Sequence, residues 1–163
     1  MEAPKRIKPK GLADYLEVIT KAVFQSGISW RVIEAKWDGF REAFANFDPQ
    51  TIAGFDPPDV DRLAEDTRIV RNRKKIEATV HNARTLLELD TEFGSFKRYL
   101  RSFGSYDDTV ADLRRRLKFL GDTGAYFFLY VVGEEVPAHE DWMAARGGQM
   151  GRPRSRARGG RTA

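Results

Sequence analysis

The chain has 163 residues, of which 41% are hydrophobic and 12% aromatic, as in a single globular domain. Its formal net charge is +4, and it contains no cysteine, which excludes disulfides and thiolate metal sites and suits a reducing compartment. No apolar run approaches the roughly 18 residues of a membrane span, and the polar residues 1–10 lack a signal-peptide core. We therefore expect a cytoplasmic protein without a membrane partner.

Apolar residues recur at spacings of three and four along most of the chain, which predicts helices. The first two series are Leu12, Tyr15, Leu16, Ile19 and Val23, then Val32, Ile33, Trp37, Phe40 and Phe44. Strand-like alternation is nowhere sustained. The predicted fold class is all-α.

The later helices are predicted from their end signals. Asp56 before Pro57 and Pro58 is typical of a helix N-terminus. A longer helix is expected from about Arg73 to about Gly94. Two more are expected over residues 95–103 and 108–117.

A glycine turn follows three consecutive arginines at 114–116. Residues 118–124 read Lys-Phe-Leu-Gly-Asp-Thr-Gly and lead into a helix that is apolar nearly all round. A helix, a short hairpin and a second helix with outward-facing N-terminal amides form an anion site that suits a DNA phosphate. The alternative is an ordinary turn between two core helices. The aromatic residues at 127–130 are expected in the core rather than against bases.

Positive charge is concentrated at the C-terminal end. From Arg146 to Ala163 there are six arginines and no acidic residue, so the preceding 145 residues carry a net charge of −2. A Gly/Arg/Pro segment cannot bury enough apolar surface to order itself. We expect a helical domain over residues 1–145 and a disordered basic tail over residues 146–163. The tail is either a phosphate-attracting arm or a solubilising terminus without a partner.

Three stretches resemble the motifs of one family, in order. Residues 24–30, Phe-Gln-Ser-Gly-Ile-Ser-Trp, resemble the Gln-(Ala/Ser)-Gly-Leu-Ser-Trp signature of the 3-methyladenine DNA glycosylase I family. Residues 69–76, Ile-Val-Arg-Asn-Arg-Lys-Lys-Ile, with Asn-Ala-Arg at 82–84, resemble a second signature. Residues 119–123, Phe-Leu-Gly-Asp-Thr, resemble the family's Phe-Val-Gly-(Thr/Pro)-Thr hairpin. With residues 44–48 included, the similarity spans residues 16–142.

The resemblance implies a helix-hairpin-helix DNA glycosylase-like domain that binds double-stranded DNA through its phosphates. Such enzymes extrude the damaged nucleotide, because its reacting atoms are inaccessible inside the base stack. They then hydrolyse the N-glycosidic bond of an alkylated purine, which is the first step of base excision repair. The lesion implied is 3-methyladenine, a cationic base that leaves readily and suits an aromatic pocket. We expect a monomer that needs no cofactor.

The resemblance assigns roles to four residues of the first signature. Trp30 would lie against the extruded base, and its alternative role is to anchor the second helix in the core. Gln25 would hydrogen-bond a purine edge, or else only cap the turn. Ile28 would wedge into the gap left in the duplex. Gly27 would let the backbone approach closely.

Phosphate contacts are expected from the amides of Gly121, Asp122 and Thr123, and the Thr123 hydroxyl is expected to cap the following helix. Four basic residues in or beside the family motifs are plausible supporting charges, although a solvated basic helix face is the usual explanation for such residues. They are Arg71, Arg73, Lys75 and Lys118.

The chain departs from the family at three features. The family's purine-recognising glutamate, three residues before the signature glutamine, is Ala22 here. The family's pocket tyrosine would fall before Met1, and Tyr15 is out of register. The family's zinc is held by two cysteines and two histidines, so we expect no metal here. His139 and His81 are interpreted as structural.

Several acids could replace the missing glutamate. Asp14, Glu17 and Glu34 lie near it in sequence, although acids on helices mostly face solvent. Helix-hairpin-helix glycosylases also carry an aspartate after the hairpin's second helix, where this chain has acids at 134, 135, 140 and 141. The sequence places none of them in the pocket.

The favoured function is a glycosylase for alkylated purines. The alternative is a binding protein that senses lesions through the same scaffold without cleaving the bond. A helical protein-interaction domain unrelated to DNA would require all three motifs to match by chance.

Overall fold

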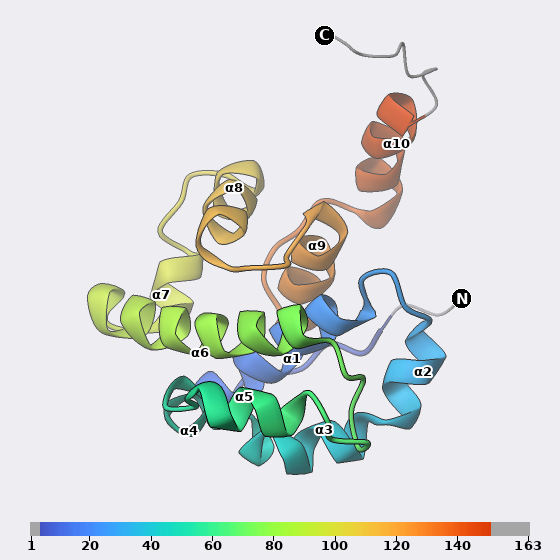
Figure 1. The fold of residues 1–163 in the computed structure, drawn as a ribbon. Coiled ribbons are helices and arrows are strands. Elements are labelled where there is room, and N and C mark those ends of the chain that lie inside the picture. Colours follow the sequence, from blue (N-terminus) through green and yellow to red (C-terminus); the bar gives the residue numbers. More distant parts are fainter. Residues whose placement is uncertain (1–3, 151–163) are drawn as a thin grey trace, which may run out of the picture.

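The computed structural model describes the backbone of residues 4–150 and the side chains of residues 4–146. Within that range the chain is helical, and the predicted all-α class is confirmed (Figure 1). The elements are α1 (Leu12–Gln25), α2 (Trp30–Ala35), α3 (Trp37–Ala43), η1 (Ala45–Phe47), α4 (Pro49–Ala53), α5 (Pro57–Leu63), α6 (Arg73–Phe93), α7 (Phe96–Leu100), α8 (Tyr106–Arg116), α9 (Asp122–Val131) and α10 (His139–Met150). Among residues 4–150, none of the helices has the length and apolar composition of a membrane span.

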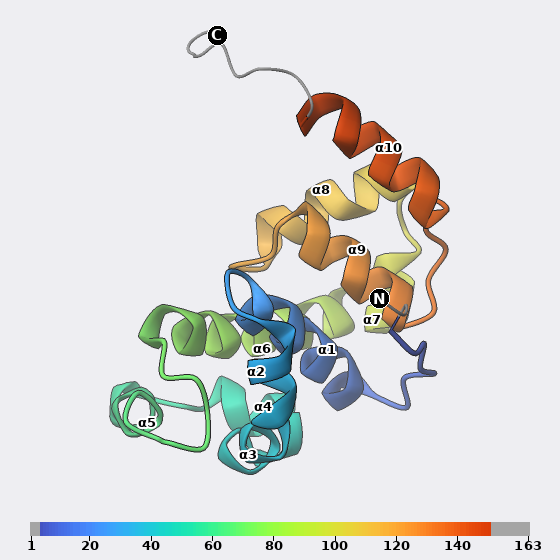
Figure 2. The ribbon, with the colours of Figure 1, turned by 90° about the vertical axis from the view of Figure 1, so that its right-hand side faces the viewer.

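Two central helices, α1 and α6, separate the other elements into two groups. Helices α3, α4 and α5 lie on one side, and α8, α9 and α10 lie on the other, as both Figure 1 and Figure 2 show. The buried face of α1 contributes Leu16, Ile19 and Val23, each fully inaccessible to solvent. One continuous core therefore supports both groups.

The second apolar series forms two helices rather than one. The backbone departs from helical geometry at Lys36 (φ −101°, ψ 1°), which separates α2 from α3. Beyond this break, the Trp37 indole N–H donates to Glu17 of α1 over 2.8 Å, and its ring stacks on Phe40 and Phe47. The periodicity predicted helix but not the break.

The predicted end signals are largely confirmed. Asp56 caps α5 in a reciprocal capping box with Asp59, and Gly94 ends α6 with a φ of +85°. The helix predicted over residues 95–103 is shorter, because α7 ends at Leu100. Helix α8 begins earlier than predicted, at Tyr106, because the Ser105 side chain accepts from the Asp108 amide and caps it.

Helix α10 extends past the predicted domain boundary at residue 145. It ends at Met150, and Trp142 on this helix stacks on Tyr126 of α9 with ring centroids 4.4 Å apart. The predicted basic tail thus begins inside a helix. The remainder of that tail, residues 151–163, lies outside the described residues.

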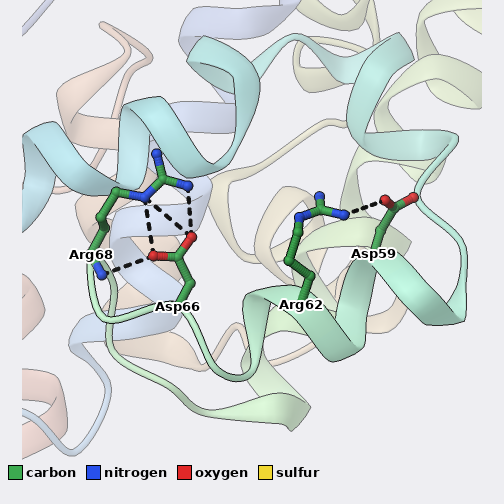
Figure 3. A network of polar contacts seen from close by, with 4 residues as sticks. All are labelled: Asp59, Arg62, Asp66 and Arg68. Carbon is green, nitrogen blue, oxygen red and sulfur yellow. Dashed lines mark hydrogen bonds and ion pairs between the residues drawn. The ribbon is translucent and has the colours of Figure 1, made fainter.

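The loop before α6 is packed against α3. Arg68 contacts both carboxylate oxygens of Asp66, at 2.7–3.2 Å, while the neighbouring Arg62–Asp59 pair lies on α5 (Figure 3). The Arg68 backbone lies so close to Gly39 that a Cβ at this position would overlap the Arg68 carbonyl oxygen. Only glycine fits there without moving the loop.

Replacing Gly39 with alanine is expected to destabilise the protein by about 1–3 kcal/mol, because backbone rather than a flexible side chain would have to move. Gly54→Ala is the matched control, since a Cβ there would make ordinary contact at 3.5 Å. Urea unfolding measures both variants. Equal stability of the two would contradict the close approach.

Candidate base pocket and nucleic-acid interface

A pocket of about 490 Å³ lies between the C-terminal end of α1, the start of α2 and the hairpin that joins α8 to α9. It collects residues that lie far apart in the chain, from Ala22 to Arg146. The lining residues are Ala22, Gln25, Ser26, Gly27, Ile28, Trp30, Phe119, Gly121, Asp122, Thr123, Gly124 and Arg146. The structure therefore brings together the four residues predicted from the first signature and the three predicted from the hairpin.

Trp30 is the first residue of α2, whose N-terminus is capped by Ser29 accepting from the Arg31 amide at 3.2 Å. Its half-buried ring lies 6.3 Å from the Phe127 ring, centroid to centroid. Trp30 thus packs on the core and also lines the pocket, so the two predicted roles do not exclude each other. Gln25 ends α1 and is also half-buried at the pocket.

A buried lysine, Lys75, holds the turn after α1 through hydrogen bonds to its backbone. Gly27 has a φ of +77°, and a Cβ there would meet nothing within 4 Å, so the glycine is needed for its backbone conformation. The ammonium of Lys75, on α6, donates to the carbonyl oxygens of Phe24 at 3.0 Å and Ser26 at 2.5 Å. Burial lowers the pKa of Lys75. Lys75 is only 4% exposed, so it anchors this turn instead of reaching DNA as predicted.

Helix α6 also holds the hairpin, through Asn82 and His81, which lie one to two turns after Lys75. The Asn82 side chain accepts from the Lys118 amide at 2.8 Å and donates to the Lys118 carbonyl oxygen at 3.2 Å. His81 Nε2 lies 3.0 Å from the carbonyl oxygen of Arg116, at the end of α8. The second signature therefore fixes both loops that line the pocket, one through Lys75 and the other through Asn82.

The first turn of α9 faces solvent at the edge of the pocket. Gly121, Asp122 and Thr123 are exposed, and a Cβ on Gly121 would meet nothing within 4 Å. The prediction that Thr123 caps the helix is wrong. Gly121 is the N-cap residue and no side chain caps this end, because Thr123 already lies inside the helix.

The predicted supporting charges lie outside the pocket. Arg73 pairs with Asp61 over 2.7 Å, and Arg71 and Lys118 are exposed. None of the three is among the residues that line it. The residues that do line it include Arg146 and Phe119, which were expected only as part of the tail and of the hairpin motif. Arg146 reaches it from α10, and Phe119 is 47% exposed with an unusual positive φ of +61°.

Among the described residues, Asp122 is the only acid that lines this pocket. Three of the acids considered as replacements for the missing glutamate bind other partners. Glu17 accepts from Trp37 and Arg41, Asp14 accepts from the Lys10 amide, and Glu134 is buried against Arg101. Position 22 itself is a buried wall of the pocket, with Ala22 only 3% exposed.

Volume alone does not identify this pocket as the site. Another pocket of about 480 Å³ lies around Arg101 and Glu134, but none of its lining residues belongs to the three motifs. Tyr15, out of register in the sequence, is buried against Phe96 and Phe128 and lines neither of these pockets. Two motifs line the pocket around Trp30 and the third holds its loops, which selects this pocket as the candidate site.

Comparison with known proteins shows the family of the chain. The family described as methyladenine glycosylase matches residues 12–123, a span that holds all three motifs. The chain belongs to the methyladenine glycosylase family. It is similar to the DNA-3-methyladenine glycosylase 1 of Escherichia coli K12, with 29% identity over 130 residues covering 67% of this chain and 70% of that protein. The Haemophilus influenzae DNA-3-methyladenine glycosylase is 28% identical over the same shares of the two chains.

Solved structures share the fold. The 3-methyladenine DNA glycosylase I of Staphylococcus aureus superposes with a TM-score of 0.68 and 27% identity, covering 78% of this chain and 79% of that one. A variant of a 3-methyladenine DNA glycosylase I in complex with 3-methyladenine superposes with a TM-score of 0.67 and 27% identity, each chain being 80% covered. The arrangement of helices around the pocket is therefore that of this family.

The zinc that the family resemblance implies does not fit this chain. There is no cysteine, and no group of three candidate ligands comes together among the described residues. His139 lies instead beside the rings of Tyr126 and Trp142, at 5.9 and 6.2 Å. Aromatic packing, together with the 2.8 Å hydrogen bond from the Tyr126 hydroxyl to the Pro137 carbonyl oxygen, attaches α10 to α9.

Proposed function

We propose that this protein is a DNA repair glycosylase that hydrolyses the N-glycosidic bond of alkylated purines such as 3-methyladenine. The observation that carries the proposal is the convergence of Gln25, Trp30 and the Gly121 hairpin on one pocket in a methyladenine glycosylase fold. A pocket of about 490 Å³ is in the range of sites that enclose small ligands. Such an enzyme acts in base excision repair on double-stranded DNA with alkylated bases.

Because the lesion is a good leaving group, the pocket needs to contribute less stabilisation of the transition state. A purine alkylated at a ring nitrogen is cationic, so the leaving base becomes neutral as the glycosidic bond breaks. The Trp30 face can stabilise the cationic base by a cation–π interaction, and Gln25 can hydrogen-bond its edge. The cation–π interaction is strongest before the bond breaks, so it selects and holds the cationic base, whereas only contacts that strengthen in the transition state accelerate bond cleavage itself. In this proposal Ile28 and Gly27 occupy the gap left by the extruded nucleotide.

Contacts to the duplex are assigned to the hairpin. The exposed amides of Gly121, Asp122 and Thr123 would bind a phosphate at the α9 N-terminus. Arg71, Arg73 and Lys118 would add long-range attraction from outside the pocket. We propose a cytoplasmic monomer, with the basic tail as an arm that strengthens nonspecific binding.

A second function, lesion sensing without base release, is favoured by one observation. Position 22 holds alanine at the pocket wall, where the family resemblance implies the purine-recognising glutamate. A sensor would keep the duplex contacts and lose the chemistry. It predicts salt-dependent binding without a free-base product.

Trp30→Ala is expected to lower release of 3-methyladenine from methylated duplex DNA by about 10- to 100-fold, because stacking on a base contributes about 1–3 kcal/mol. Trp30→Phe keeps an aromatic face and is expected to retain most of the activity. Gly121→Glu adds a carboxylate in open space beside the proposed phosphate and is expected to weaken duplex binding. The measurement is chromatography of the free bases released by each purified protein.

Base release by the wild type that is lost in Trp30→Ala supports the glycosylase function. Duplex binding without any release supports the sensor. Release that survives unchanged in both Trp30→Ala and Gly121→Glu would contradict the assignment of this pocket.

A further inference from the structure

Two arginines from different helices share one aspartate at the rim of the base pocket. Arg114 of α8 contacts one carboxylate oxygen of Asp122 at 2.6 Å, and Arg146 of α10 contacts the other at 3.1 Å. Asp122 is the first residue of α9. This cluster of Arg114, Asp122 and Arg146 therefore ties α8, α9 and α10 together beside the hairpin.

Arg146 is held in place by more than the ion pair. Its guanidinium lies over the Trp142 ring, 4.7 Å from the centroid, and Trp142 in turn stacks on Tyr126 of α9. An arginine ordered on an aromatic ring loses less side-chain entropy when it binds a ligand. The Arg146 side chain is therefore preorganised in the free protein.

The cluster carries a net charge of +1 and remains accessible. The side chain of Arg114 is 48% exposed and that of Arg146 is 29% exposed. Exposed ion pairs contribute only about 0–1 kcal/mol to stability, so stability alone does not account for two arginines on one aspartate. Each guanidinium has five N–H donors, and Asp122 accepts from only one on each arginine, at Nη1. No other acceptor among residues 4–146 contacts either guanidinium, so the remaining donors face no competing partner there and are available to an oxyanion.

We propose that Arg114 and Arg146, oriented by Asp122, form a clamp for a DNA phosphate beside the base pocket. The inference rests on the proposed function and extends the duplex interface from the α9 hairpin onto α8 and α10. Arg146 lines the base pocket, and both arginines line the adjoining pocket of about 400 Å³, so a bound phosphate would lie next to the extruded nucleotide. Asp122 acts as a positioning residue, since its own charge opposes the ligand.

Arg114→Gln and Arg146→Gln each test the clamp. Each is expected to weaken binding to undamaged duplex about eightfold at roughly 0.1 M salt, and to reduce the slope of log K against log salt by about 0.9. Arg115→Gln is the matched control, because Arg115 lies on the same helix but pairs with Asp112. Fluorescence anisotropy across a salt series measures the affinities, and thermal unfolding checks the fold.

Asp122→Asn gives the sharpest test, because two explanations predict opposite signs. If Asp122 orients the arginines, the variant binds duplex more weakly although it has lost a negative charge. If Asp122 only repels phosphate, the variant binds more tightly. Tighter binding overturns the proposal, and so does an Arg115→Gln variant as impaired as Arg114→Gln and Arg146→Gln.

Base release is measured on the same variants, which separates this inference from the proposed function. A wild type that neither binds duplex nor releases bases contradicts both. A wild type that binds and releases while Arg114→Gln and Arg146→Gln behave like Arg115→Gln contradicts only the clamp.

Discussion

Replacing Ala22 with glutamate is expected to raise the rate of 3-methyladenine release by about tenfold to a hundredfold. A hydrogen bond to a charged group contributes about 1.5–3 kcal/mol, and each 1.4 kcal/mol changes a rate tenfold. Ala22 lies on α1 three residues before Gln25, so both side chains project from the same face of the helix toward the pocket. A carboxylate there would hold the cationic base in the pocket and raise the fraction of lesions that are extruded, which increases the observed rate of release.

The first turn of α9 packs closely beside position 22, since a Cβ built on Gly124 would already be in contact with the Ala22 Cβ at 3.5 Å. The new side chain must therefore extend into the pocket that Ala22 lines. Ala22→Gln has nearly the same volume without the charge and is the matched control. Single-turnover release from methylated duplex DNA measures the three proteins. Equal rates for the glutamate and glutamine variants would contradict an electrostatic role for this position.

Lys75→Met is expected to lower the free energy of unfolding by about 2–3 kcal/mol. Methionine fills similar space but leaves the carbonyl oxygens of Phe24 and Ser26 without their donor, and an unsatisfied buried group costs about 1–3 kcal/mol. Base release is expected to fall as well, because the turn that carries Gly27 and Ile28 loses its anchor. Urea unfolding and the release assay are the two measurements.

Lys74→Met is the control for this variant. Lys74 is the exposed neighbour of Lys75, so its replacement is expected to change stability by no more than about 0.5 kcal/mol. If Lys75→Met were as stable as Lys74→Met, the ammonium would not be needed to hold the turn.

The family signatures combine residues that line the pocket with residues that support it from inside. Trp30 and Gln25 line the pocket, whereas Lys75 and Asn82 are 4% and 1% exposed and hold its two loops from α6. A basic or amide residue in a motif looks the same in the sequence whether it contacts DNA or a backbone carbonyl. Burial separates the two roles.

Local signals predicted the ends of helices well. The capping box at Asp56 and the left-handed conformation of Gly94 depend only on residues that are neighbours in the sequence, so they can be predicted from it. Thr123 was wrongly predicted as the cap because α9 begins earlier in the hairpin, with Gly121 as its N-cap residue. The break at Lys36 was missed because it accompanies a contact between Trp37 and Glu17, twenty positions away.

The amino-acid sequence alone predicted the all-α class, the family and the pocket-lining residues of two separate motifs. Periodicity, caps and motif order suffice for this, because they are local properties that survive divergence. Three features are visible only in the folded protein: Lys75 points inward, α10 packs on α9, and Arg146, counted with the basic tail in the sequence, lies at the pocket beside Asp122. These outcomes depend on contacts between residues distant in the chain, and neither composition nor spacing specifies which charge meets which partner.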